Sequence, residues 1–199
     1  MRFHKFISTI LHPIVVPTLG VLLYFSFVAQ SIEPNEQMLL LGLVFGITYI
    51  IPVLALIILK SLGLIRSFQV TTIRERRMPV LLMTLLFYLL GNTLGQFTTF
   101  KDLALLFYGT SFSLLCSYLL FALDLKSSLH LLSMGSALGF FLAVMNIYAL
   151  SLLPVVMVMI LLTGLVASSR LYLNAHTPKE LVSGFSVGFL GQVLIFWIL

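Results

Sequence analysis

Charged residues are scarce in this sequence. Only 9% of its 199 residues are Asp, Glu, Lys or Arg, whereas 60% are hydrophobic, and the mean hydropathy is +1.16. A soluble globular domain needs more polar surface than this to cover its core in water. The composition therefore excludes an ordinary soluble globule and favours a chain that is embedded in a membrane.

Cysteine and acidic residues are also few, and each shortage excludes a class of protein. The single cysteine, Cys116, has no partner in the chain, so no intrachain disulfide supports the fold. The only aspartates are Asp102 and Asp124, too few for the aspartate-rich motifs with which an intramembrane prenyltransferase holds magnesium and diphosphate. The formal net charge of +5 would suggest nucleic acid in a soluble protein. Here the cations fall between apolar runs and no nucleic-acid motif is present, so we expect no nucleic-acid partner.

Long apolar runs make up most of the chain. Crossing the hydrocarbon takes roughly 20 apolar residues, because every backbone polar group must be paired inside the helix. The sequence predicts an all-α, polytopic transmembrane bundle of about six to seven spans, forming a single domain over residues 1–199. Pro13 and Pro17 predict a kink or a late helix start near His12 in the first run. We place the runs at about 7–28, 37–60, 79–98, 102–122, 129–150, 152–170 and 179–199.

Nearly all cationic side chains fall on one side of this arrangement. With seven spans, the N-terminus, a basic loop at 60–79 and the junctions at 124–130 and 170–180 share one side, which we call the N-terminal side. Every lysine and arginine except Lys101 lies there. The positive-inside rule makes this side cytoplasmic. Arginines placed to bind a substrate anion would not count as topology signals, so the compartment stays open.

The sharpest polar cluster lies where the sixth run ends and the seventh begins, in SRLYLNAHTPKE at 169–180. Arg170 offers a planar fork of donors suited to phosphate, and His176 can act as a nucleophile or a base. Glu180 can fix the tautomer of that imidazole through Nδ1. Thr177 and Glu180 also form a helix-capping box, and Arg170 at a span end can extend to lipid headgroups.

This segment resembles the third signature of the type 2 phosphatidic acid phosphatase and haloperoxidase superfamily, S-R-x5-H-x3-D. Ser169, Arg170 and His176 match, and Glu180 stands where the family has Asp. The surrounding AHTPKELVSGFSVG also resembles a small membrane subgroup known from Bacteroidetes-type bacteria. The resemblance implies a lipid phosphatase of a bacterial inner membrane that needs no metal ion or cofactor. Its substrate would be a lipid phosphate such as phosphatidate, phosphatidylglycerophosphate or an isoprenoid phosphate.

The segment KSSLH, from Lys126 to His130, resembles the second signature of that family, P-S-G-H, through Ser128 and His130 only. By this resemblance, His176 attacks phosphorus and forms a phosphohistidine, and Glu180 orients it. His130 would protonate the leaving alkoxide. Ser128 and Lys126 would hold the phosphoryl oxygens.

The first signature of the family, K-x6-R-P, does not occur in the sequence. Arg74, Arg76 and Arg77 precede Pro79 and can supply cationic donors to a phosphate together with Arg170. The sequence does not tell which of the three points inward. Such a run is also typical of a basic loop that contacts anionic lipid.

Other functions are compatible with the same residues. His130, His176 and Glu180 could ligate zinc in a metal hydrolase, although the cationic surroundings disfavour a metal ion. Arginines and histidines in a polytopic bundle also suit a transporter or flippase for an anionic lipid, and a catalytically inactive relative would bind lipid phosphates without cleaving them. His12 can line the same cavity, but a lone histidine at the start of a span more often serves as an interfacial anchor.

Overall fold

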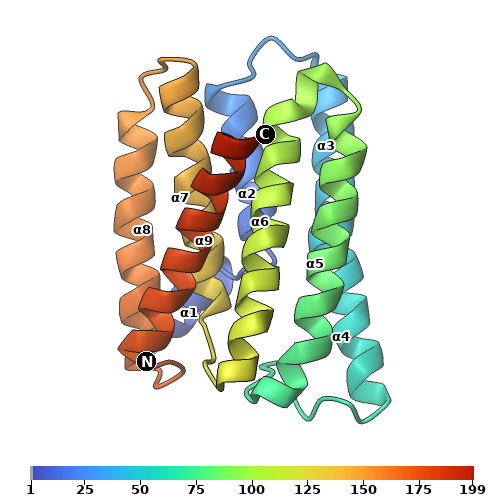
Figure 1. Cartoon of the computed structure of the whole chain (residues 1–199), viewed down its shortest axis with the longest axis vertical. Helices are drawn as coiled ribbons and strands as arrows, with labels where there is room; N and C mark the ends of the chain where they lie inside the picture. The colour runs from blue at the N-terminus through green and yellow to red at the C-terminus, as the bar shows by residue number, and fades with distance from the viewer. Residues whose placement is uncertain (1) are drawn as a thin grey trace.

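The computed structural model describes residues 2–199, which fold into helices joined by short loops (Figure 1). Six helical segments in this part of the chain are long and apolar enough to cross a membrane, so the chain is an integral membrane protein with an all-α fold. In chain order the helices are α1 (Arg2–Ile10), α2 (Val16–Phe27), α3 (Pro34–Phe45), α4 (Ile51–Ser61), α5 (Ile73–Gly95), α6 (Lys101–Leu120), α7 (Leu129–Ile147), α8 (Leu153–Tyr172) and α9 (Pro178–Ile198). A π-helical turn at Gly46–Ile50 joins α3 to α4 without a break.

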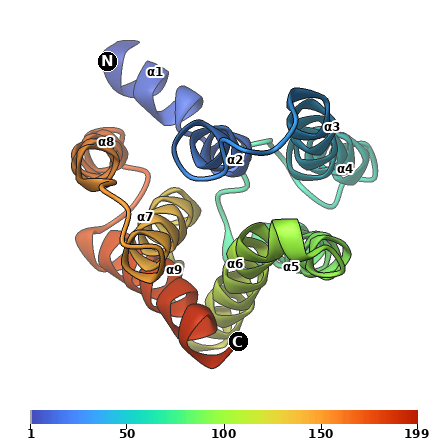
Figure 2. The ribbon, with the colours of Figure 1, turned by 90° about the horizontal axis from the view of Figure 1, so that it is seen from above.

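The run predicted at 7–28 is interrupted near His12, where the sequence predicts a kink or a late helix start. The chain leaves the helical conformation after Ile10 and resumes it at Val16. Pro13 explains the break, because proline lacks an N–H and disfavours the α conformation of the residue before it, His12. Helix α1 lies against α8 beside the bundle (Figure 2), and α2 is shorter than the six long segments.

The predicted basic loop at 60–79 is wrong at its C-terminal end, because α5 begins at Ile73. A capping box starts the helix: the Thr72 hydroxyl accepts from the Glu75 N–H at 3.3 Å, and the Glu75 carboxylate accepts from the Thr72 N–H at 3.3 Å. Pro79 lies inside the helix, where its missing N–H removes one backbone hydrogen bond. The other predicted runs agree with the helices to within a few residues.

The two ends of the bundle differ in charge. The N-terminus, α1 and the loops at 61–72, 124–128 and 173–177 gather at one end, which is the lower end in Figure 1. This agrees with the predicted N-terminal side. The C-terminus and Lys101 lie toward the other end.

Glycines bring α9 close to α7. A Cβ added to Gly184 would overlap the backbone of Ser128, and one added to Gly188 would overlap the carbonyl oxygen of Leu132. Backbone atoms cannot move aside as a side chain can, so only glycine permits this approach. It holds the first turn of α9 beside the start of α7, where the Ser128 N–H donates to the Glu180 carbonyl at 2.9 Å.

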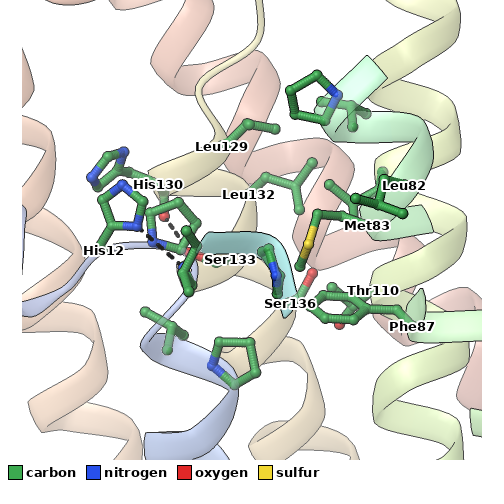
Figure 3. Close-up of a pocket in the computed structure, with 18 of the residues that line it drawn as sticks. His12, Leu82, Met83, Phe87, Thr110, Leu129, His130, Leu132, Ser133 and Ser136 are labelled. Carbon is green, nitrogen blue, oxygen red and sulfur yellow. Dashed lines mark hydrogen bonds between the residues drawn. The ribbon is translucent and has the colours of Figure 1, made fainter. Parts of the chain in front are cut away.

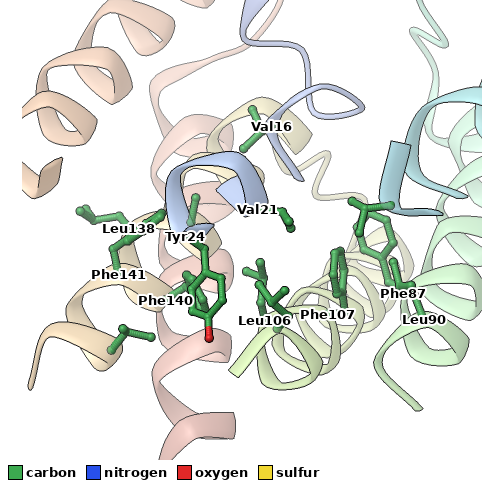
Figure 4. Packing of buried hydrophobic residues seen from close by; sticks show 14 of the residues in the cluster. Val16, Val21, Tyr24, Phe87, Leu90, Leu106, Phe107, Leu138, Phe140 and Phe141 are labelled. Carbon is green, nitrogen blue, oxygen red and sulfur yellow. The ribbon is translucent and has the colours of Figure 1, made fainter. Parts of the chain in front are cut away.

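Aromatic side chains fill much of the core between α2, α5, α6 and α7 (Figure 4). The rings of Phe87 and Phe107 meet edge to face with centroids 5.8 Å apart, and Tyr24 packs on Phe140 at 5.8 Å. Inside a membrane, such contacts hold helices together through close packing. Phe87, Phe107 and Phe140 also line a cavity that these helices help to enclose.

Candidate active site

A cavity of about 170 Å³ lies among α2, α4, α5, α6 and α7. Apolar side chains form most of its wall; Met83 and Phe87 lie on one side of it, across from His12 and His130 (Figure 3). Basic side chains from five separate segments of the chain converge on it. They are His12, Arg76, His130, Arg170 and His176. The cavity thus joins a cationic region to an apolar one.

His176 lies in the loop between α8 and α9, and Glu180 fixes its orientation. Nδ1 of His176 is 2.9 Å from Oε2 of Glu180. A carboxylate only accepts, so Nδ1 carries the proton and the lone pair is on Nε2. The same Oε2 accepts from the Thr177 N–H at 3.1 Å, so the capping box is present as well. One carboxylate therefore starts α9 and orients the imidazole.

The surroundings keep His176 neutral. The pKa of His176 is lowered to about 4, mainly by burial and also by the positive charges of Arg76 and Arg170, which together outweigh the opposing effect of the hydrogen bond to Glu180. At pH 7 the pair is thus a neutral imidazole beside a carboxylate. An unprotonated ring nitrogen is the form that a nucleophile requires.

Arg76 is the arginine of the basic run that reaches the cavity. Its side chain is buried, whereas Arg74 and Arg77 are exposed. Nε donates to the Val70 carbonyl at 2.9 Å and Nη1 donates to the Ser127 carbonyl at 3.2 Å. Val70 has a φ of 47°, which is costly for a β-branched residue, and Arg76 ties this turn to the start of α7. Its other N–H groups remain for a ligand.

Ser8 of α1 connects Arg170 to His130. Nη1 of Arg170 donates to the Ser8 hydroxyl at 2.8 Å, and Nε2 of His130 is 3.1 Å from the Ser8 carbonyl. Within residues 2–199, Nε of Arg170 is buried without a partner. A buried guanidinium N–H that lacks an acceptor is unfavourable, and an anion would supply one. Nothing in the sequence singles out Ser8, because its partners are more than 100 residues away.

Four of the six predicted phosphate ligands do not line the cavity: Arg74, Arg77, Lys126 and Ser128. Ser128 is fully buried next to α9, and its Oγ has no hydrogen-bond partner in the part of the chain that the structure describes. Nζ of Lys126 reaches the Thr71 carbonyl at 3.4 Å. Arg74 and Arg77 are exposed on the surface of α5.

The zinc alternative has no matching geometry among residues 2–199, where no group of three or more His, Cys, Asp or Glu side chains is placed to hold a metal ion. Nε2 of His130 faces Ser8, and Nδ1 of His176 faces Glu180. These contacts turn the two rings toward different partners.

No family model matches the chain, and neither a curated protein nor a solved structure matches it. The case for a function therefore depends on the residues that line the cavity.

Proposed function

We propose that this protein is a lipid phosphatase of a bacterial inner membrane that hydrolyses a lipid phosphate through a phosphohistidine. The observation that supports the proposal best is the neutral imidazole of His176, with its lone pair on Nε2, in a cavity shared with Arg76 and Arg170. The two guanidinium groups suit phosphoryl oxygens. The apolar part of the cavity suits a lipid chain, as in phosphatidate, phosphatidylglycerophosphate or an isoprenoid phosphate.

The proposed reaction has two steps. First, the Nε2 lone pair of His176 forms a P–N bond while the P–O bond to the lipid breaks. His130, which takes up a second proton when the phosphate dianion binds beside it, gives that proton to the departing oxygen. Second, water attacks phosphorus, the electrons of the P–N bond return to Nε2, and His130 takes a proton from the water. Arg76 and Arg170 neutralise the phosphoryl oxygens in both steps. His130 exchanges its contact with Ser8 for the lipid oxygen when substrate binds.

The direct test of this function is phosphate release by the purified protein in detergent. We expect release from a panel of lipid phosphates in the presence of a chelator, and much less from a water-soluble phosphate ester that has no chain for the apolar region. Folded wild-type protein that releases no phosphate would contradict the proposal. Binding of lipid phosphate without release would then indicate a binder or a transporter.

Glu180→Gln should lower kcat/KM by about 100-fold, because the imidazole loses the carboxylate that orients it and stabilises its positive charge. His176 attacks only when neutral, so activity should be lost as the pH falls through its pKa of about 4. Glu180 raises that pKa, and without its charge the pKa falls. The acid limb of the kcat/KM profile should therefore move to lower pH in the variant. An unmoved or higher acid limb would show that Glu180 does not act on the titrating group.

Gly20→Leu should block the lipid chain without disturbing the fold. Gly20 lines the cavity, and a Cβ added there would meet no atom within 4 Å. The added side chain fills apolar space, so we expect kcat/KM for a long-chain lipid phosphate to fall about 10-fold or more, and less for a short-chain analogue. Gly164→Leu is the matched control, because Gly164 also has open space around it but lies outside the cavity lining. An equal loss of kcat/KM for the long-chain and the short-chain substrate would contradict the placement of the lipid chain beside Gly20.

A further inference from the structure

The three imidazoles at the cavity hold their protons differently. His176 donates from Nδ1 to Glu180, which leaves a lone pair on Nε2. Nε2 of His130 faces the Ser8 carbonyl at 3.1 Å, so its proton is on Nε2 and already has an acceptor. His12 differs from both: its Nδ1 accepts the Ile14 N–H at 3.3 Å. The proton of neutral His12 is therefore on Nε2.

The Nε2–H of His12 is an available donor at the cavity. Among residues 2–199, the only side-chain hydrogen bond of His12 is the one at Nδ1. Its ring lies edge to face with the ring of His130, with centroids 5.1 Å apart (Figure 3). Burial and, to a smaller extent, the charge of Arg170 lower the pKa of His12 to about 4. His12 thus stays neutral at pH 7 with its tautomer fixed by the backbone.

We propose that His12 binds a phosphoryl oxygen of the substrate through its Nε2–H, as a neutral hydrogen-bond donor. The inference rests on the proposed phosphatase function and adds a phosphoryl ligand from the break between α1 and α2. No proton moves in this role. A neutral imidazole with a fixed tautomer can stabilise an oxygen that gains negative charge and remain uncharged itself.

A structural role for His12 predicts a different outcome. Its backbone carbonyl accepts from the N–H groups of Val15 and Val16, and its ring accepts from Ile14, so His12 also holds the turn that leads into α2. Two substitutions separate the roles. In His12→Asn, Oδ1 can accept the Ile14 N–H in an Asx-turn, but no donor stands at the Nε2 position. In His12→Gln, the amide NH2 can reach that position, but the hydrogen bond from the Ile14 N–H is lost.

The test measures orthovanadate binding by calorimetry and the unfolding temperature in detergent, beside phosphate release. We expect His12→Asn to bind vanadate about 10-fold more weakly at an unchanged unfolding temperature, since a hydrogen bond to an anion is lost. His12→Gln should bind within about 3-fold of wild type and unfold at a lower temperature. The assignment would be overturned if His12→Asn bound vanadate as tightly as the wild type, or if both variants lost the same amount of affinity. It would also be overturned if the wild type bound no vanadate.

The binding measurement keeps the two proposals apart. The expected vanadate pattern in protein that releases no phosphate would support His12 as an anion ligand and contradict the phosphatase. Phosphate release by the wild type together with unchanged binding in His12→Asn would contradict only the role of His12.

Discussion

His176→Ala should reduce phosphate release from a lipid phosphate by at least about 1,000-fold, to the background of the assay. Of the three imidazoles at the cavity, only His176 has an unprotonated Nε2, because His12 and His130 carry their protons there. Neither can replace the nucleophile without changing its tautomer and its partner. The measurement is the initial rate of phosphate release by wild-type and variant protein with chelator present.

His4→Ala is the control for this variant. His4 stacks on Tyr172 with ring centroids 4.1 Å apart, and its Nδ1 is 3.2 Å from the Ser169 hydroxyl. It does not line the cavity, so its loss should change the rate by only a few-fold. A His176→Ala variant that retains more than a few per cent of the wild-type rate would exclude the phosphohistidine route.

Arg76→Met should lower kcat/KM by about 100-fold, because a donor to the charge that develops on the phosphoryl oxygens is removed from a water-poor site. Arg74→Met and Arg77→Met remove the same charge from exposed positions on the same helix. Both should stay within about 3-fold of wild type. The measurement is kcat/KM of the three variants and of the wild type with the same lipid phosphate.

Arg76 also contributes to the stability of the fold, so a second variant is needed to separate this contribution from catalysis. Arg76 also holds the carbonyls of Val70 and Ser127, so the unfolding temperature must be measured with the kinetics. Arg76→Lys keeps the charge without the planar fork, and we expect intermediate activity. Equal losses in Arg76→Met, Arg74→Met and Arg77→Met would mean that net charge at this end of the bundle matters and the cavity does not.

Much of the fold was predictable because a membrane span has a strong local signal. About 20 apolar residues must pair their backbone within one helix, so composition alone locates the long helices. The start of α5 was missed although Thr72 and Glu75 have the spacing of a capping box. Proline is common in the first turn of a helix, so Pro79 predicts a start there, but the structure has it inside the helix. With the correct start at Ile73, Arg74 and Arg77 are three residues apart and share an exposed face of the helix, whereas Arg76 is buried.

The site was predictable only where its contacts are local. His176 and Glu180 are four residues apart at a helix start, so their hydrogen bond follows from the spacing. The contacts of Ser8 with Arg170 and His130 join α1 to helices more than 100 residues away, and no local pattern encodes them. His12 was expected to be an interfacial anchor, since its place beside His130 depends on how α2 packs against α7.

The central claim is a covalent bond between His176 and phosphorus. The direct measurement is to quench the wild-type enzyme during turnover of a lipid carrying ³²P in its phosphate group, and to locate the label on the peptide that contains residue 176. The account predicts an acid-labile, base-stable phosphate on His176 that is absent from His176→Ala. Phosphate release by the wild type with no such label, or with the label on another residue, would contradict it.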